Sequence, residues 1–372
     1  MPRRSVYKRK VDSLLEYADI HIGGDQPSDL QIHNPDTYAR IFGKGTIGFG
    51  EAYMDGWWDC EALDEFFTRV VRAKIANNIR TWHDKFFFLK AWLLNQQAGK
   101  RSFRVGKQHY DAGNDLYQRM LDQRMIYSCG YWRDVQTLDE AQQQKLDLIC
   151  RKLDLGPGMR VLDIGCGWGG AAKFAAENYG VEVVGITISH QQLEFGNATC
   201  AGLPVDLRMQ DYKTLNEPFD RIFSVGMFEH VGFKNYRNFF EIVDRCLNDD
   251  GLFLLHTIGA NFSSVKSDPW FEKYIFPNSV TPSIKLIGGA IENLFVIEDW
   301  HNFRSDYDQT LLAWYKNINA KWHELPAYDE RFQRMWNYYL MASAGSFRAG
   351  NNQVWQIVLS KRGMKYGYEA PR

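Results

Sequence analysis

From residue 159 onward the sequence alternates between short apolar runs and helix-like segments, and this alternation limits the chain to few folds. Five runs read as strands, at 159–165, 181–187, 205–211, 219–226 and 251–259. Two more candidates follow late in the chain, at 295–300 and 353–361, the last after a helical stretch. Strands that alternate with helices are typical of a parallel sheet covered on both faces. The sequence therefore predicts a seven-stranded, doubly wound α/β domain.

The region before this alternation has a different character. Residues 1–95 read as mainly helical, with glycine-rich turns, and residues 95–108 ("NQQAGKRSFRVGKQ") resemble a polar linker. A length of 372 residues is compatible with two domains. We therefore expect a smaller, mainly helical N-terminal domain over 1–95, a linker over 96–107 and the α/β domain over 108–372.

Composition narrows the class of protein. Hydrophobic residues make up 45% and charged residues 24% of the chain, and the net charge is −1, as in ordinary globular proteins with a sizeable core. The N-terminus lacks the apolar run of a signal peptide, and nothing approaches the roughly 20 apolar residues of a spanning helix. The six cysteines form neither a CxxC pair nor a zinc-ligand spacing. Reduced thiols, a cytoplasmic location and no metal site are expected.

One stretch of the N-terminal half is strongly basic. Residues 69–104 carry nine Lys/Arg against the single acid Asp84, and bulky apolar side chains such as Trp82, Phe86 and Trp92 lie between the cations. This pattern is typical of a helix that lies in an anionic membrane interface. The alternative is a helix that packs its aromatic side chains into the domain core. A nucleic-acid site is not expected, because no nucleic-acid-binding motif accompanies the charge.

A glycine-rich loop follows the first strand of the α/β region. In "VLDIGCGWGG" (161–170) the glycines let a ligand approach the backbone where the next helix begins. Gly165, Gly167 and Gly170 also satisfy GxGxxG, so the loop alone leaves a nicotinamide enzyme open. Two features favour S-adenosylmethionine instead. Asp163 completes the D-x-G-x-G-x-G form that resembles S-adenosylmethionine-dependent methyltransferases, and strand two ends in Thr187 where a dinucleotide enzyme wants an acid.

Further polar residues stand where other strands end. Asp211 ends the third strand in "MQDY" and suits recognition of an adenine amino group. "VGMFEHVG" (225–232) places Glu229 and His230 at the end of the fourth strand. A buried acid there needs a partner or a function. His230 is expected to point away, into the loop or helix that follows.

Several motifs, taken in order, resemble the bacterial cyclopropane-fatty-acyl-phospholipid synthases over nearly the whole chain. They are "GEAYMDGWWDCEALDEFF" (50–67), "YSCGYW" (127–132), "GMFEHVG" (226–232), "LLHTIG" (254–259), "KYIFPN" (273–278) and "WHNFRSDYDQTLLAWY" (300–315). The resemblance implies a class I methyltransferase domain. It also implies methyl transfer from S-adenosylmethionine to a cis double bond of a phospholipid acyl chain, through a carbocation, with closure of a cyclopropane ring.

The resemblance also implies a set of site residues. A bound bicarbonate ion would be the base that removes a proton from the transferred methyl, held by Cys129, Glu229, His256, Tyr307 and a backbone contact near Ile258. We expect Glu229 to orient His256 or to accept the bicarbonate hydroxyl hydrogen. The cofactor contacts carried over by position are Tyr127, Ser128, Asp163, Gly165, Gly167, Thr187, Gln192, Gln210, Asp211 and Tyr212.

Alternatives remain open. A fatty-acyl C-methyltransferase that makes a methyl branch would pass through the same cation, and a membrane-binding scaffold with a degenerate methyltransferase fold would need neither cofactor nor base. A small-molecule methyltransferase would not need the basic, aromatic N-terminal half. The partners implied are a bilayer of unsaturated phospholipid at the inner face of the cell membrane and a second copy of the chain. The N-terminal half could contact either.

Overall fold

The computed structural model describes residues 2–74, 113–264 and 267–372, which form two compact units. We call one the sheet unit; it contains the described residues within Leu94–Val265, Asn278–Asp306 and Gln353–Arg372. The other, the helical unit, contains those within Met1–Leu93, Lys266–Pro277 and Tyr307–Asn352. Each unit is therefore assembled from segments that are far apart in the sequence.

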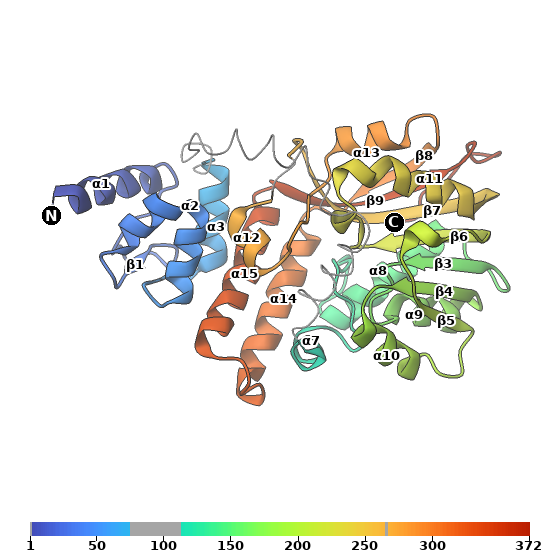
Figure 1. Ribbon diagram of the computed structural model, residues 1–372, viewed down its shortest axis with the longest axis horizontal. Helices are drawn as coiled ribbons and strands as arrows, with labels where there is room; N and C mark the ends of the chain where they lie inside the picture. Colours follow the sequence, from blue (N-terminus) through green and yellow to red (C-terminus); the bar gives the residue numbers. More distant parts are fainter. Residues whose placement is uncertain (1, 75–112, 265–266) are drawn as a thin grey trace. The chain divides into compact units, whose positions relative to one another are not determined.

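The sheet unit is built on a seven-stranded sheet with the order β5-β4-β3-β6-β7-β9-β8 (Figure 1). Its strands are β3 (Arg160–Ile164), β4 (Glu182–Thr187), β5 (Val205–Met209), β6 (Phe219–Val225), β7 (Leu247–Ala260), β8 (Val296–Asn302) and β9 (Asn352–Ser360). The pairs formed among β3, β4, β5, β6 and β7 are parallel, whereas β8 pairs antiparallel with β9. The predicted seven-stranded doubly wound fold is confirmed.

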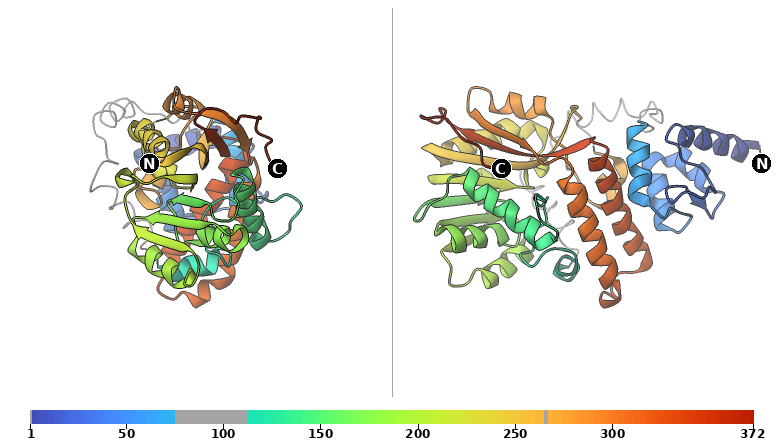
Figure 2. Two further views of the ribbon diagram at one scale, coloured as in Figure 1. Left: turned by 90° about the vertical axis from the view of Figure 1, so that its right-hand side faces the viewer. Right: turned by 180° about the vertical axis from the view of Figure 1, so that it is seen from behind.

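Helices cover both faces of this sheet. Their bounds are α7 (Asn114–Met120), α8 (Leu138–Lys152), α9 (Gly170–Tyr179), α10 (His190–Thr199), α11 (Tyr236–Cys246) and α13 (Ile284–Ile291). Side chains of α8 and α9 join one buried cluster, and side chains of α11 and α13 join another. Helix α8 is seen in front of the sheet in the right-hand view of Figure 2.

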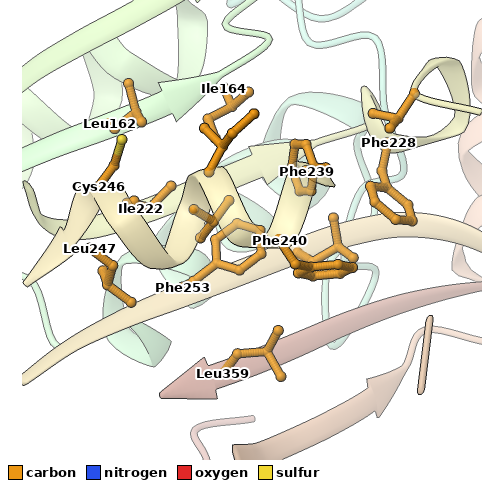
Figure 3. Close-up of a cluster of buried hydrophobic side chains, with 14 of the residues drawn as sticks. Leu162, Ile164, Ile222, Phe228, Phe239, Phe240, Cys246, Leu247, Phe253 and Leu359 are labelled. Atoms are coloured by element: carbon orange, nitrogen blue, oxygen red, sulfur yellow. The ribbon is translucent and has the colours of Figure 1, made fainter. Parts of the chain in front are cut away.

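The period-two alternation of the strands assigns their residues to these two clusters. Leu162, Ile222 and Phe253 pack with the α11 side, where Phe239 and Phe240 project from the helix onto the sheet (Figure 3). Their chain neighbours Val161, Phe223 and Leu252 pack with the α8 side. Successive strand side chains point to opposite faces, so an apolar run without alternation is what a sheet buried on both faces requires.

The helical unit contains α1 (Pro2–Glu16), α2 (Thr37–Met54), α3 (Leu63–Arg72), α12 (Pro269–Tyr274), most of α14 (Asp306–Lys321), and α15 (Glu330–Arg348), with a small ladder of β1 (Gln31–Ile32) and β2 (Trp58–Asp59). Helix α15 packs against α2 and α3. The core of the helical unit is aromatic. Trp58 and Trp270 are fully buried, and Tyr338 lies against the Trp270 ring at 4.3 Å between ring centroids. Much of the high aromatic content therefore forms this core.

Close packing of α15 on α3 depends on a glycine. A Cβ atom at Gly345 would lie 2.7 Å from Asp64 O and 2.8 Å from Thr68 N, both backbone atoms that cannot turn aside. We expect Gly345→Ala to reduce stability by about 1–3 kcal/mol, seen as a lower Tm. Gly288→Ala in α13, where a Cβ meets nothing within 4 Å, is the matched control and should leave Tm unchanged or slightly raised. Equal Tm values for the two variants would contradict this packing.

The domain division at 1–95, 96–107 and 108–372 stays a prediction, because its boundaries fall among residues outside those described. The same holds for most of the basic stretch 69–104. The described residues do show that α12, α15 and most of α14 belong to the compact unit of the N-terminal helices, although they come from the C-terminal half of the chain. In the described ranges, none of the helices has the length and apolarity to span a bilayer.

Candidate active site

A pocket opens where the parallel strands of the sheet unit end. It is lined by the loop after β3, by the ends of β4 and β6, and by residues that follow β5. The chain runs from β3 to β4 on one side and later returns to place β6 on the other. In open α/β sheets such a switch point leaves a crevice at the carboxyl ends of the strands, so the topology itself creates the pocket.

The glycine loop shapes the floor of this pocket. Gly165 has φ +89°, and a Cβ there would lie 2.6 Å from Met227 Cβ. The backbone N–H groups of Gly165 and Cys166 both donate to Ile186 O, at 3.0 Å each. The loop is thus tied to the neighbouring strand β4. A side chain at residue 165 would be strained and would clash.

The structure brings together all ten residues predicted as cofactor contacts. Each lines the pocket: Tyr127, Ser128, Asp163, Gly165, Gly167, Thr187, Gln192, Gln210, Asp211 and Tyr212. Two of them also contact each other, since Thr187 Oγ1 donates to Gln192 Oε1 at 2.8 Å. Asp211 Oδ1 accepts from the backbone N–H of Lys213 at 3.1 Å. Their roles toward a cofactor stay predictions.

Asp163 is the most strongly perturbed acid of the pocket. Its side chain is 2% exposed, and its Oδ2 atom has no hydrogen-bond partner among the described residues. Burial raises the pKa of Asp163 to about 8, against an opposing effect of Lys145. A cationic ligand would stabilise the ionised carboxylate, so Asp163 suits an ammonium group.

Two side chains of α8 that the sequence did not single out hold the segment around residue 128. The helix begins at a capping box, in which Thr137 and Glu140 satisfy each other's backbone N–H groups. One turn further on, Gln142 Nε2 donates to Ser128 O and Lys145 Nζ donates to Ser128 Oγ, both at 2.8 Å. Both side chains are fully buried. In the sequence, two polar residues three positions apart on a helix, such as Gln142 and Lys145, normally indicate a face exposed to solvent. No feature of the sequence therefore indicated that these two side chains are buried.

A second group of buried polar residues lies beside the pocket without lining it. Glu229 belongs to a short 3₁₀ turn (Phe228–His230) after β6, and its Oε1 accepts from the backbone N–H of Ile258 at 2.6 Å. Its Oε2 has no partner among the described residues. Burial raises the pKa of Glu229, and the Ile258 hydrogen bond partly opposes that shift. Glu229 thus fastens the end of β7 to the turn after β6.

His256 lies two residues before Ile258 on β7, paired in register with Val225 of β6. Its Nδ1 faces Gln356 Nε2 of β9 at 3.4 Å, and its Nε2 has no partner among the described residues. Burial, and then Lys145, hold the pKa of His256 well below its usual range, so the ring is neutral. A donating Gln356 amide assigns the hydrogen of that ring to Nε2. His256 contacts Gln356, and among the described residues no hydrogen bond joins it to Glu229.

The remaining predicted residues are placed as follows. Cys129 is fully buried, and its thiol donates to Gly130 O at 3.1 Å. Ile258 has its backbone N–H engaged by Glu229, as described above. Tyr307 belongs to the helical unit, where its ring contacts Trp314 and Phe347.

One expectation is wrong. His230 does not turn away into the following segment but lines the pocket. Burial lowers the pKa of His230 to about 4, so the ring is neutral there. His230 is the last residue of the 3₁₀ turn that follows β6, so it stays close to the strand end that contributes to the pocket.

Three buried side-chain atoms that have no hydrogen-bond partner among the described residues indicate whether S-adenosylmethionine and bicarbonate would fit. Asp163 Oδ2 in the pocket fits the ammonium group of S-adenosylmethionine. Glu229 Oε2 and His256 Nε2, an acceptor and a donor, fit the hydroxyl and an oxygen of bicarbonate. Buried polar atoms are rarely left unpaired without a reason, so the residues present suit both groups.

The fold and the pocket define a class I S-adenosylmethionine-dependent methyltransferase. A likeness to coclaurine N-methyltransferase, with a TM-score of 0.67 at 20% identity, 84% of this chain and 98% of that one, reflects this fold alone. The chain belongs to the family described as mycolic acid cyclopropane synthetase, whose family model matches residues 97–357.

Individual relatives agree with this family. The cyclopropane-fatty-acyl-phospholipid synthase of Escherichia coli K12 is 52% identical over 366 residues, which are 98% of this chain and 96% of that protein. The structure of mycolic acid cyclopropane synthase CmaA1 complexed with SAH and CTAB has a TM-score of 0.66 at 33% identity, over 70% of this chain and 98% of that one. Sphingolipid C9-methyltransferase A of Emericella nidulans is 35% identical over 89% of this chain and 68% of its own length.

Proposed function

We propose that this protein transfers the methyl group of S-adenosylmethionine to the cis double bond of an unsaturated phospholipid acyl chain and closes a cyclopropane ring. The observation that carries the proposal is that two buried polar atoms, Glu229 Oε2 and His256 Nε2, have no hydrogen-bond partner among the described residues and belong to residues that adjoin the lining of the methyltransferase pocket. Simple methyl transfer to a heteroatom has no need of a base that receives a proton from the transferred methyl, whereas ring closure does. The 52% identity to the Escherichia coli synthase over nearly the whole chain supports this choice.

Different residues of the pocket would bind different parts of S-adenosylmethionine, the methyl donor. S-adenosylmethionine supplies an electrophilic methyl group when bound. Asp163 would bind its ammonium group, and Asp211, after β5, would accept from its adenine amino group. The hydrogen bond between Thr187 and Gln192 joins the end of β4 to α10 at the same pocket.

A bicarbonate ion would supply the base. Cys129, Glu229, His256 and the backbone near Ile258, all in the sheet unit, would hold it. The resemblance adds Tyr307 to this set, and its role toward the ion stays a prediction. His256 would donate through Nε2, and Glu229 would accept the hydroxyl hydrogen through Oε2. A small base suits the task, because a protein carboxylate long enough to reach the methyl would obstruct the acyl chain.

A second candidate function is methyl branching of an acyl or sphingoid chain. The 35% identity to the fungal sphingolipid C9-methyltransferase favours it as the alternative. Both reactions begin with methyl transfer to a double bond. They differ in whether the transferred methyl itself loses the proton.

Product analysis separates the two functions. The protein would be incubated with methyl-labelled S-adenosylmethionine and vesicles of cis-unsaturated phospholipid, and the acyl chains examined by mass spectrometry and proton NMR. We expect labelled lipid with fewer olefinic protons and new shielded ring protons. Labelled lipid that keeps its unsaturation would establish branching instead, and lipid without label would refute both candidates.

We also propose that the protein acts as a homodimer at the inner face of the cell membrane. The substrate resides in a bilayer, and the basic, aromatic composition of residues 69–104 supports contact with anionic lipid. Two such segments in a dimer would strengthen vesicle binding through avidity. Sedimentation with anionic vesicles and light scattering in solution test the two parts separately.

A further inference from the structure

Ser128 is held by α8 through both its side chain and its backbone. Lys145 Nζ donates to Ser128 Oγ and Gln142 Nε2 donates to Ser128 O, both at 2.8 Å. Further along the same segment, the backbone N–H of Tyr131 donates to Ala141 O at 2.9 Å. Three hydrogen bonds therefore fasten this segment to α8.

The hydrogen bond from Lys145 determines how the Ser128 hydroxyl can act. An ammonium group has three donors and no acceptor, so Ser128 Oγ accepts in this contact and its own hydrogen is not used. Burial lowers the pKa of Lys145 to about 8, against opposing effects of Asp122 and Asp163, so the ammonium form predominates at pH 7. Among the described residues, no acceptor takes the Ser128 hydroxyl hydrogen.

The hydroxyl with this unused hydrogen lies at the wall of the methyltransferase pocket. Ser128 and Lys145 both line the pocket, as Tyr127 and Asp163 do. Ser128 is only 6% exposed, and a buried hydroxyl hydrogen without an acceptor is costly. S-adenosylmethionine carries several oxygen acceptors, in its carboxylate and its ribose. A bound molecule could therefore supply the acceptor that the protein does not.

We propose that Lys145 positions the Ser128 hydroxyl so that it donates a hydrogen bond to an oxygen atom of bound S-adenosylmethionine. This inference rests on the proposed function for the identity of the ligand. Lys145 is a positioning residue, because it acts through Ser128 and not on the reacting atoms. Gln142 has the same role toward the backbone of Ser128.

A double-mutant cycle tests whether Lys145 acts through Ser128. Calorimetry at pH 7 would give the dissociation constant for S-adenosylhomocysteine in the wild type, Lys145→Met, Ser128→Ala and the double variant. We expect each single substitution to weaken binding about 10-fold. The double variant should bind no more than about threefold more weakly than either single variant, because both substitutions remove the same hydrogen bond. Additive effects would overturn the inference.

A second cycle separates this route from one through Asp163. The charge of Lys145 also acts on that carboxyl group, so Lys145→Met could weaken binding by changing its ionisation. If Lys145 acts through Ser128, then Lys145→Met should still weaken binding about 10-fold when Asp163→Asn is already present. An effect that disappears in the Asp163→Asn background would assign the role to Asp163 and contradict the inference.

Lys152 provides a matched control on the same helix. It is also fully buried, but its Nζ pairs with Asp299 Oδ2 at 2.8 Å, and Arg372 binds the same carboxylate. In Lys152→Met the Asp299 charge stays paired with Arg372, so the affinity for S-adenosylhomocysteine should match that of the wild type. This control separates the contact with Ser128 from the loss of any buried lysine.

Ser128→Ala keeps the inference testable if Lys145→Met does not fold. The substitution removes the hydroxyl but keeps the carbonyl group that accepts from Gln142. An affinity of Ser128→Ala within twofold of the wild type would refute the donated hydrogen bond, whatever the effect of Lys145. A wild-type protein that binds no S-adenosylhomocysteine would instead refute the proposed methyl donor, so the two failures are distinguishable.

Discussion

Replacing Glu229 with glutamine is expected to lower kcat roughly 100-fold, with the dissociation constant for S-adenosylmethionine within about twofold of the wild type. Glutamine can still accept from the Ile258 N–H through Oε1, so the end of β7 stays in place. What is lost is the charge and the acceptor at Oε2. Glu229 does not line the donor pocket, and donor affinity should therefore be preserved.

The comparison needs a chemically identical change elsewhere in the sheet unit. Glu298 of β8 accepts from Ser360 Oγ and from the Met364 N–H, and Glu298→Gln should leave kcat unchanged. Single-turnover measurement of methyl transfer to vesicle lipid gives the rate, and equilibrium dialysis gives the affinity. A Glu229→Gln enzyme with a kcat within threefold of the wild type would contradict the site assignment.

Replacing Asp163 with asparagine should weaken S-adenosylmethionine binding about 100-fold at pH 8, because a buried ion pair with the ammonium group is lost. Near this pH the carboxylate of the free protein is half ionised, since burial raises the pKa of Asp163 to about 8. Asp206→Asn, on the exposed side of β5, is the control and should bind normally. Affinity unchanged in Asp163→Asn would exclude an ionic role for Asp163.

The effect of Asp163 has a defined sign with pH. The ligand selects the ionised carboxylate, so the ratio of wild-type to Asp163→Asn affinity should rise from pH 6 to pH 8; the titration of the ligand's own amine cancels in that ratio. The stability of the ligand-free wild-type protein changes in the opposite direction and falls as the pH rises. A carboxyl pKa raised from about 3.9 in the unfolded chain favours the protonated fold, and this contribution is lost as pH rises toward about 8. Ligand-free Asp163→Asn should therefore gain Tm relative to the wild type over this range.

The sequence predicted the fold and the donor pocket well for a physical reason. Strands buried on both faces read as continuous apolar runs, and the polar residues that end them must converge at one edge of a parallel sheet. The positions of the strand ends alone thus predict that Asp163, Thr187 and Asp211 lie together.

Other residues could not be found in this way. Lys145 and Gln142 lie in "LDEAQQQKLDLICRK", where glutamines and lysines of a helix ordinarily face water. Gln356 sits within the apolar strand β9, and its contact with His256 crosses 100 residues of sequence. Such contacts depend on tertiary packing, which the local pattern does not encode.

The interleaving of the two units has a consequence for how the chain folds as it leaves the ribosome. The contact between Arg72 NH2, at the end of α3, and Arg348 O, at the end of α15, spans 276 residues. At a synthesis rate of about 5–20 residues per second, the N-terminal helices wait roughly 14–55 s for their partner. During this time the apolar face of α3, with Phe66 and Phe67, lacks the helix that covers it. The N-terminal helices are made first, yet their apolar face stays open to aggregation or to chaperone binding until α15 has been synthesised.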